Sequence, residues 1–157
     1  MLMVDPLKPD LCNCLALRQA ARHVTQFYDH YLAPTGVRAT QFSILAKLAG
    51  LGPITINALA EDLVMDRTTL GRNLQPLERE GLIAVTKGRA DRRSKELQLT
   101  DAGAARLQAA SKAWAEAQTR FETSFGGKRA SDLRTILRAV TASDLVPAAP
   151  DAPEPAA

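Results

Sequence analysis

Basic side chains cluster between residues 87 and 95, where Asp91 is the only acidic residue. A cluster of this kind is the electrostatic footprint expected where a loop meets phosphates or enters the minor groove of a duplex. A lone basic cluster is more often a solvated surface, so the interpretation depends on what surrounds it in the chain. The candidate phosphate-binding residues are Lys87, Arg89, Arg92, Arg93 and Lys95.

The segment before this cluster has the pattern of a helix with one polar face. Asp66 is a preferred N-cap residue, and Leu70, Leu74 and Leu77 follow at helical spacing, so one face packs inward. Pro76 removes the backbone donor to the carbonyl of Arg72 and could kink the helix. Polar side chains on the other face can reach base edges or phosphates, although the short ones could equally be ordinary exposed positions. They are Arg67, Thr68, Thr69, Arg72, Asn73 and Gln75, of which Arg72 is the strongest candidate.

Turn residues and apolar periodicity predict the elements that must position these side chains. The central pair of helices is separated by little more than Val64 and Met65, which is a helix-turn-helix spacing. The full prediction is a helix over about 10–33 capped by Asp10; a helix carrying Phe42, Leu45 and Leu48 and closed by Gly50, Gly52 and Pro53; a short helix capped by Thr55; the helix capped by Asp66; strands over 82–85 and 97–99; a long helix capped by Thr100 and broken at Gly126 and Gly127; and a last helix from about Ser131.

The predicted fold is therefore mainly α with a small β-hairpin wing. We expect one domain over residues 10–145, preceded by an arm over residues 1–9. Residues 146–157 are rich in Pro and Ala and have no apolar periodicity, which predicts a flexible tail.

Composition excludes several classes of protein. The hydrophobic share of 46% in 157 residues suits a globular domain, and no apolar run is long enough to span a bilayer. The first residues lack the features of a secretory signal, so we expect a cytoplasmic protein without membrane contact. Enzyme motifs are missing, which predicts a protein that is not an enzyme and needs no cofactor. His23 and His30 lack metal-ligand spacing, so no metal site is expected.

From about Asp10 to Thr141 the chain resembles the MarR family of transcription regulators. The most specific match is Asp91 and Arg93 followed by Leu97-Gln98-Leu99-Thr100-Asp101-Ala102-Gly103, which is similar to the family's wing signature. The resemblance implies a winged helix-turn-helix over about 38–99 and dimerisation helices over about 10–33 and 100–142. It also implies that Asp91 holds Arg93, so that the guanidinium projects from the wing tip toward a narrow minor groove.

The same resemblance implies a homodimer that binds an inverted-repeat operator in double-stranded DNA. The helix that starts at Asp66, Arg67, Thr68, Thr69 and Leu70 would be the recognition helix. A small-molecule effector, unidentified by the sequence, would lie between the dimerisation helices and the winged domain. Its candidate contacts are Phe27, Tyr31, Phe42 and Trp114, although Trp114 taken alone indicates a core or dimer position.

Cys12 and Cys14 are one residue apart on the predicted first helix, which makes a mutual disulfide geometrically poor. We expect at least one of them to be buried. Cys14-Leu15-Ala16-Leu17 nevertheless resembles the first-helix cysteine of the hydroperoxide-sensing branch of that family, in which tyrosines from the partner chain bond to the thiolate. That resemblance implies possible redox activity at Cys14, with Tyr28 and Tyr31 as candidate partners.

The preferred function is a dimeric, sequence-specific DNA-binding regulator, interpreted as a repressor whose DNA affinity is modulated by a small molecule. Two alternatives stay open. One is a thiol-based peroxide sensor that uses Cys14 on the same scaffold. The other is a winged-helix module that makes protein contacts only and does not bind DNA, which would show no salt-dependent DNA affinity.

Overall fold

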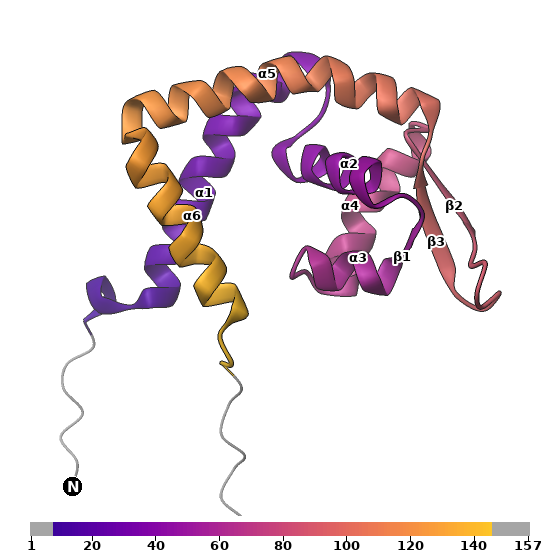
Figure 1. The fold of residues 1–157 in the computed structure, drawn as a ribbon, viewed down its shortest axis with the longest axis horizontal. Coiled ribbons are helices and arrows are strands. Elements are labelled where there is room, and N and C mark those ends of the chain that lie inside the picture. The colour runs from indigo at the N-terminus through magenta and orange to yellow at the C-terminus, as the bar shows by residue number, and fades with distance from the viewer. Residues whose placement is uncertain (1–7, 146–157) are drawn as a thin grey trace, which may run out of the picture. The chain divides into compact units, whose positions relative to one another are not determined.

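The structure is a computed structural model that describes residues 8–145 (Figure 1). The chain divides into two compact units, one that ends at Phe121 and one that begins at Glu122. Residues 1–7 of the predicted arm and the predicted tail over 146–157 lie outside the described residues. The elements in chain order are η1 Pro9–Leu11, α1 Asn13–Leu32, η2 Ala33–Thr35, α2 Ala39–Leu51, β1 Ile54–Thr55, α3 Ile56–Asp62, α4 Arg67–Arg79, β2 Ile83–Lys87, β3 Lys95–Leu99, α5 Asp101–Phe125 and α6 Gly127–Ala142.

This order confirms the predicted mainly α fold with a winged helix-turn-helix between terminal helices. The wing is broader than predicted, because β1 joins the two strands of the hairpin. All three strands are antiparallel, in the order β1-β3-β2, and β1 places Ile54 opposite Leu97. A strand of two residues is too short to show alternation, so the sequence pattern alone could not reveal it. None of the described helices is both long and apolar enough to cross a bilayer.

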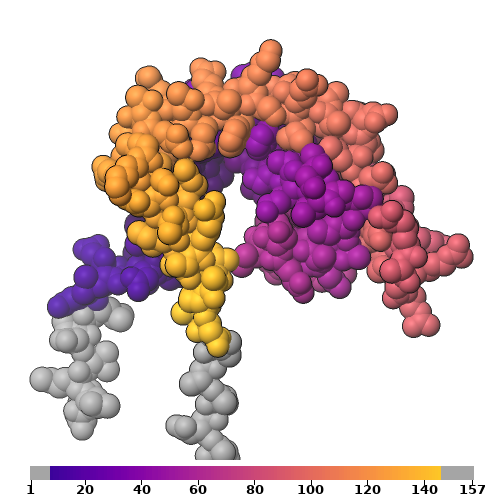
Figure 2. Space-filling model, viewed as in Figure 1, coloured from indigo at the N-terminus to yellow at the C-terminus, as the bar shows by residue number. Residues whose placement is uncertain are grey.

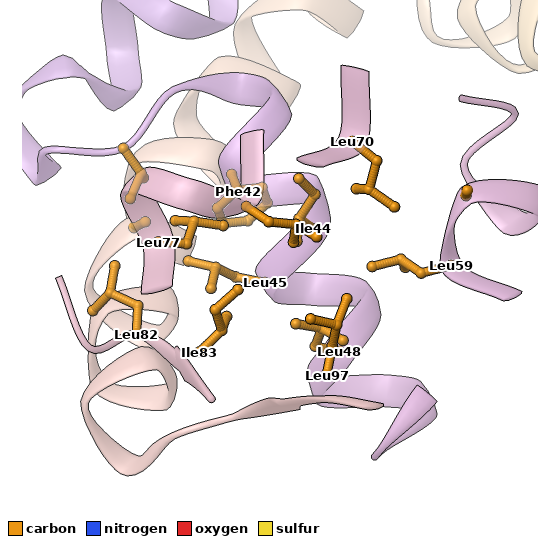
Figure 3. Close-up of a cluster of buried hydrophobic side chains, with 14 of the residues drawn as sticks. Phe42, Ile44, Leu45, Leu48, Leu59, Leu70, Leu77, Leu82, Ile83 and Leu97 are labelled. Atoms are coloured by element: carbon orange, nitrogen blue, oxygen red, sulfur yellow. The ribbon is translucent and has the colours of Figure 1, made fainter. Parts of the chain in front are cut away.

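The core of the first unit is built around α2 (Figure 3). Leu45 and Leu48 of α2 are fully buried, and so are Leu70 and Leu77 of α4 and Leu97 of β3. Truncating a buried leucine of this kind to alanine typically costs about 2–5 kcal/mol of stability. The apolar face of α4 is therefore fixed against α2 and the sheet, which leaves its polar face directed away from the core.

Three predicted helix caps are confirmed. The Thr55 hydroxyl accepts the N–H of Ala58 at 3.1 Å. The Asp66 carboxylate accepts the N–H of Thr69 at 2.9 Å, and the Thr100 hydroxyl accepts the N–H of Gly103 at 3.0 Å. These hydrogen bonds satisfy amides that have no partner inside the helix, and they explain why α3, α4 and α5 begin where they do.

The prediction that Asp10 caps the first helix is wrong. Asp10 lies inside η1, and α1 begins at Asn13 with Cys12 at the N-cap. The Cys12 sulfur accepts the N–H of Leu15 at 3.4 Å. Pro9 explains this difference. Its fixed φ suits the first position of a short helical turn, so Asp10 is taken up in that turn and α1 begins later in the chain.

Glycines define two further boundaries. Of the three residues predicted to close α2, Gly52 ends the helix with a φ of 70°, while Gly50 lies inside it. Helix α6 begins at Gly127 instead of near Ser131, because Gly126 alone, at a φ of 101°, forms the break after α5. A left-handed glycine reverses the chain in a single residue, so the second glycine is free to enter the next helix.

Candidate nucleic-acid interface

The polar face of α4 presents the predicted side chains opposite its buried leucines. Five of the predicted residues are exposed and Asn73 is partly buried. Pro76 does not end the helix, which continues from Arg67 to Arg79. Among the described residues, Arg67 and Arg72 take part in no ion pair, so their guanidinium groups remain available to an external anion. The exposed residues are Arg67, Thr68, Thr69, Arg72 and Gln75.

Two of these polar side chains are used inside the helix. The Thr69 hydroxyl donates to Asp66 Oδ1 at 2.6 Å, and Asn73 Nδ2 donates to the Thr69 carbonyl at 2.9 Å. Two hydrogen bonds lower the pKa of Asp66 below its usual value of 3.8. The larger effect comes from the Thr69 hydroxyl and the next from the Thr69 backbone N–H. Thr69 and Asn73 therefore fix the start of α4, and the arginines are the side chains best placed to reach outward.

The turn between α3 and α4 sets the direction of α4. The Met65 N–H donates to the Ala60 carbonyl at 2.9 Å and closes the turn. Val64 has a φ of 52°, a left-handed conformation that is costly for a β-branched residue. The short connection keeps α3 against α4, as a helix-turn-helix requires.

The wing tip is a hydrogen-bonded loop over residues 88–94. The Gly88 N–H donates to the Ser94 carbonyl at 2.8 Å, and the Ser94 hydroxyl donates to the Asp91 carbonyl at 2.7 Å. The Asp91 carboxylate accepts the backbone N–H of Arg93 at 2.9 Å. Asp91 thus holds Arg93 by its main chain, and within residues 8–145 the Arg93 guanidinium takes part in no ion pair. Figure 2 shows the hairpin standing out from the rest of the first unit.

Arg89 differs from its neighbours because its charge is paired. Its Nε lies 3.4 Å from Glu96 Oε2, and its N–H donates to Glu96 Oε1 at 3.2 Å. The Glu96 side chain is only 13% exposed, so this carboxylate is shielded by the hairpin. Asp91 is the only acidic residue within 87–95, but Glu96 lies one residue beyond that segment, and strand pairing brings it back to Arg89.

Lys87 and Lys95 are directly opposite each other in the last pair of the hairpin. Like charges in this position destabilise a two-stranded ladder. Both side chains are exposed. A polyanion beside the wing would relieve this repulsion, and the wing thereby combines two opposed lysines with two exposed arginines, Arg92 and Arg93.

A separate pocket of about 220 Å³ lies between α1, α2 and α5. Of the four predicted effector contacts, Phe42 and Trp114 line it, with nearly parallel rings whose centroids are 6.0 Å apart. Phe27 and Tyr31 do not line it, and their ring centroids lie 5.2 Å apart in a separate aromatic group. The remaining lining residues were missed, although the helical spacing of those on α1 could have indicated a shared face: Val24, Thr25, Tyr28, Leu32, Ala39 and Ser43.

The cysteines and histidines lie apart from both sites. Cys12 and Cys14 are both exposed, so the expectation that one is buried is wrong. Each lies at the start of α1, a region with no buried residue in the first three turns of the helix. His23 and His30 lie on α1, and both are exposed. Among the described residues, no group of three His, Cys, Asp or Glu residues could hold a metal ion.

Comparison with known proteins places these features in a family context. The profile described as MarR family matches residues 37–95. The organic hydroperoxide resistance transcriptional regulator of Bacillus subtilis strain 168 is 29% identical over 100 residues, which cover 64% of this chain and 68% of that protein.

Two similar solved structures are complexes with DNA. The Mycobacterium tuberculosis transcriptional regulator MosR is 38% identical, with 83% of this chain and 97% of that chain covered and a TM-score of 0.72. The transcriptional repressor CouR, bound to a 23-mer duplex, is 29% identical, with 87% and 99% covered and a TM-score of 0.75.

Proposed function

This chain belongs to the MarR family of transcriptional regulators, and we propose that it is a dimeric, sequence-specific DNA-binding repressor released by a small-molecule effector. The main supporting observation is that α4 and the wing tip both carry exposed arginines that form no ion pair with a described residue. Both elements belong to one unit with a common core. In the proposal residues 38–99 form the DNA-binding part of a domain over 10–145, and the terminal helices supply the dimer contacts. The function is regulation by binding, without catalysis.

In the proposed complex the start of α4 enters the major groove. Arg72 is assigned to a base edge, where a guanidinium can bind both acceptors of a guanine, and Arg67 is assigned to the adjacent backbone. The wing follows the phosphates, and Arg93 reaches a narrow minor groove, where the negative potential is strongest. The DNA complexes of MosR and CouR support this assignment, as does the lack of ion pairs at these arginines within the described part of the chain.

Fluorescence anisotropy with cognate and scrambled duplexes at several salt concentrations tests the proposal. Arg93→Ala is expected to weaken binding to both duplexes and to reduce the salt slope by about one, because it removes a charge without removing a base contact. Arg72→Ala is expected to cost about 1–3 kcal/mol on the cognate duplex and much less on the scrambled one.

Two control variants sharpen this test. Arg89→Ala removes a charge that Glu96 already pairs, so its loss should be smaller than that of Arg93→Ala. Lys112→Ala removes an exposed charge on α5, far along the chain from the wing, and should leave the affinity unchanged. If Arg93→Ala binds both duplexes as tightly as the wild type, the hairpin is not a DNA-contacting wing and a protein-interaction module becomes the better assignment.

A second function, thiol-based sensing on the same scaffold, is favoured by the exposure of both cysteines at the start of α1. A hydroperoxide would transfer its terminal oxygen to the Cys14 thiolate as the O–O bond breaks, which yields a sulfenic acid and, after protonation, an alcohol. Cys14→Ser should then abolish any loss of operator binding caused by hydroperoxide, while Cys12→Ser should not. Unchanged operator binding by oxidised wild-type protein would exclude this function.

A further inference from the structure

The ion pair with Glu96 sets Arg89 apart from the other basic residues of the wing. Building on the proposed function, in which the wing contacts DNA, we infer that Glu96 withholds Arg89 from the phosphates and so limits the affinity of the wing for any duplex. Among the described residues, Arg89 is the one cation of the 87–95 cluster that takes part in an ion pair. Glu96 acts on DNA binding through Arg89, which makes it a positioning residue.

Glu96 occupies a fixed place in the middle of the sheet. Its strand, β3, lies between β1 and β2, and Glu96 is paired with Thr55 on one side and with Thr86 on the other. Side chains alternate along a strand, so Glu96 lies on the face opposite the buried Leu97. Because the backbone is paired on both sides, the carboxylate has little freedom to move away from Arg89.

One carboxylate holds both the main chain and the side chain of Arg89. Glu96 Oε1 accepts the Arg89 N–H at 3.2 Å, and Glu96 Oε2 lies 3.4 Å from Arg89 Nε. The first contact fixes the point from which the arginine side chain leaves the loop. The second contact draws the guanidinium back to the face of the hairpin that carries Glu96.

Transfer of Arg89 from Glu96 to a phosphate is opposed by the environment of the carboxylate. The Glu96 side chain is only 13% exposed, whereas that of Arg89 is 75% exposed. If the guanidinium left, the carboxylate would remain largely shielded from water, without its cation and close to a polyanion. The neutral pair, in turn, neutralises no phosphate and releases no counterion. The cations of the cluster that stay available to DNA are Lys87, Arg92, Arg93 and Lys95.

Glu96→Gln tests the inference, because the glutamine amide has nearly the same shape and its oxygen can still accept the Arg89 N–H. The variant frees the Arg89 guanidinium, so we expect tighter binding to cognate and scrambled duplexes alike. The gain should be about fivefold for each wing, which is the value of one charge pair in contact in water. The salt slope should steepen by about 0.9 for each wing. Fluorescence anisotropy at several salt concentrations measures both quantities.

A double-mutant cycle separates the release of Arg89 from the simple loss of a negative charge near DNA. Arg89→Ala and the double variant Arg89→Ala, Glu96→Gln complete the cycle. Long-range repulsion by the carboxylate would make Glu96→Gln tighten binding equally whether or not Arg89 is present. We expect a larger gain with Arg89 present, because only then does the variant acquire a phosphate contact. Equal gains in the two backgrounds would overturn the inference.

The Nε–Hε resonance of Arg89 in nitrogen-15 NMR spectra observes the side chain directly, and its loss in Arg89→Lys assigns it. In the wild type the Glu96 contact persists in the complex, so addition of a duplex should shift this resonance less than it does in Glu96→Gln. A shift in the wild type as large as that in the variant would mean that Arg89 leaves Glu96 for DNA, and would contradict the inference.

Arg93→Ala, measured in the same series, separates this inference from the proposed function. Weaker binding by Arg93→Ala, together with unchanged affinity and salt slope for Glu96→Gln, contradicts the role of Glu96 and leaves the proposed function intact. Weaker binding by Glu96→Gln also contradicts that role, since it would mean that Glu96 directs Arg89 toward DNA. Wild-type protein that shows no salt-dependent binding to either duplex contradicts both.

Discussion

At the scale of single residues, polar side chains near the proposed DNA surface have two separate tasks. Asp66 and Asp91 both accept backbone N–H groups, from Thr69 and Arg93 respectively, and so fix the start of α4 and the tip of the wing. The arginines carry the charge that faces outward. Carboxylates close to a polyanion would normally repel it, but here each is committed to the main chain, where it shapes the surface that presents the cations.

Asp66 leads to a prediction about pH. Hydrogen bonds from Thr69 hold its pKa below 3.8, so its stabilising effect is complete above pH 3.8 and disappears as pH falls through the lower, folded-state pKa. Asp66→Ala should lower the thermal midpoint at neutral pH, and the difference from wild type should shrink in acid. Thermal unfolding followed by circular dichroism across that range measures it.

Asp66→Asn is the matched control, since its amide oxygen can still cap α4 but does not titrate. It should lose less stability than Asp66→Ala at neutral pH, and its difference from Asp66→Ala should not vary with pH. A constant difference between wild type and Asp66→Ala down to strong acid would refute the assigned role of the carboxylate.

The sequence predicted these residue-scale features where they depend on neighbouring residues, and it did not predict contacts between residues far apart in the chain. The caps at Thr55, Asp66 and Thr100 follow from residue type and position alone, because a cap depends on the next three residues. The ion pair of Arg89 with Glu96 depends on strand register, and the pocket depends on how three helices meet. Neither is encoded within a short window of sequence.

At the scale of elements, the base of the wing is joined to α5 at one tight corner. The Thr100 hydroxyl donates to the Gly81 carbonyl at 2.6 Å, and the Thr100 N–H donates to the Leu82 carbonyl at 3.2 Å. Gly103 is buried at this corner, where a β-carbon would collide with the Leu82 carbonyl oxygen and approach Leu99 Cδ1 to 2.7 Å. The wing and α5 can pack this closely only because residue 103 has no side chain.

Gly103→Ala is therefore expected to destabilise the protein by about 1–3 kcal/mol, as overpacking of a rigid site typically does. Gly50→Ala is the control, because Gly50 lies inside α2 and a β-carbon at this position would have no described neighbour within 4 Å. That change should stabilise by roughly 0.5–1 kcal/mol, since alanine is the better helix former. Urea denaturation compares the two, and equal stability of Gly103→Ala and wild type would contradict the packing described.

The turn of the helix-turn-helix stores strain at Val64. Its φ of 52° is a left-handed conformation, and its side chain is 71% exposed, so little packing offsets the cost. Val64→Gly should raise stability by about 1 kcal/mol, while Val64→Ala, which keeps a β-carbon, should gain much less. Denaturant midpoints for the two variants test this, and the expectation fails if alanine and glycine are equivalent.

Element order was predictable because each helix carries its own periodicity and its own stop signal. Strand β1 was not predicted, because it has only two residues and is defined by its pairing with β3. The sequence placed the end of α2 at Gly50, Gly52 and Pro53 together, and in the structure it is Gly52 that adopts the left-handed conformation and ends the helix. Which of several glycines ends a helix is decided by tertiary packing beyond it, and propensity gives only a weak preference.

At the scale of the whole molecule, apolar side chains remain exposed in each of the two units. In the first unit, Leu17 of α1 is 41% exposed. In the second, α6 exposes Ile136, Leu137 and Val140 by 61%, 38% and 39%. Three neighbouring apolar side chains on one helix form the kind of surface that another chain usually covers.

We expect a second copy of this chain to cover these surfaces, in an obligate dimer with two-fold symmetry. A two-fold protein reads an inverted repeat, so the operator half-sites should lie about one helical turn, roughly 34 Å, apart. Ile136→Glu places a charge on the exposed face of α6 and should shift the protein toward monomer while sharply reducing operator affinity. Ser131→Glu adds the same charge to α6 without altering an apolar side chain, so it should leave both properties unchanged. Sedimentation velocity and anisotropy on the same samples measure the two effects, and a stable folded wild-type monomer at micromolar concentration would contradict the dimer.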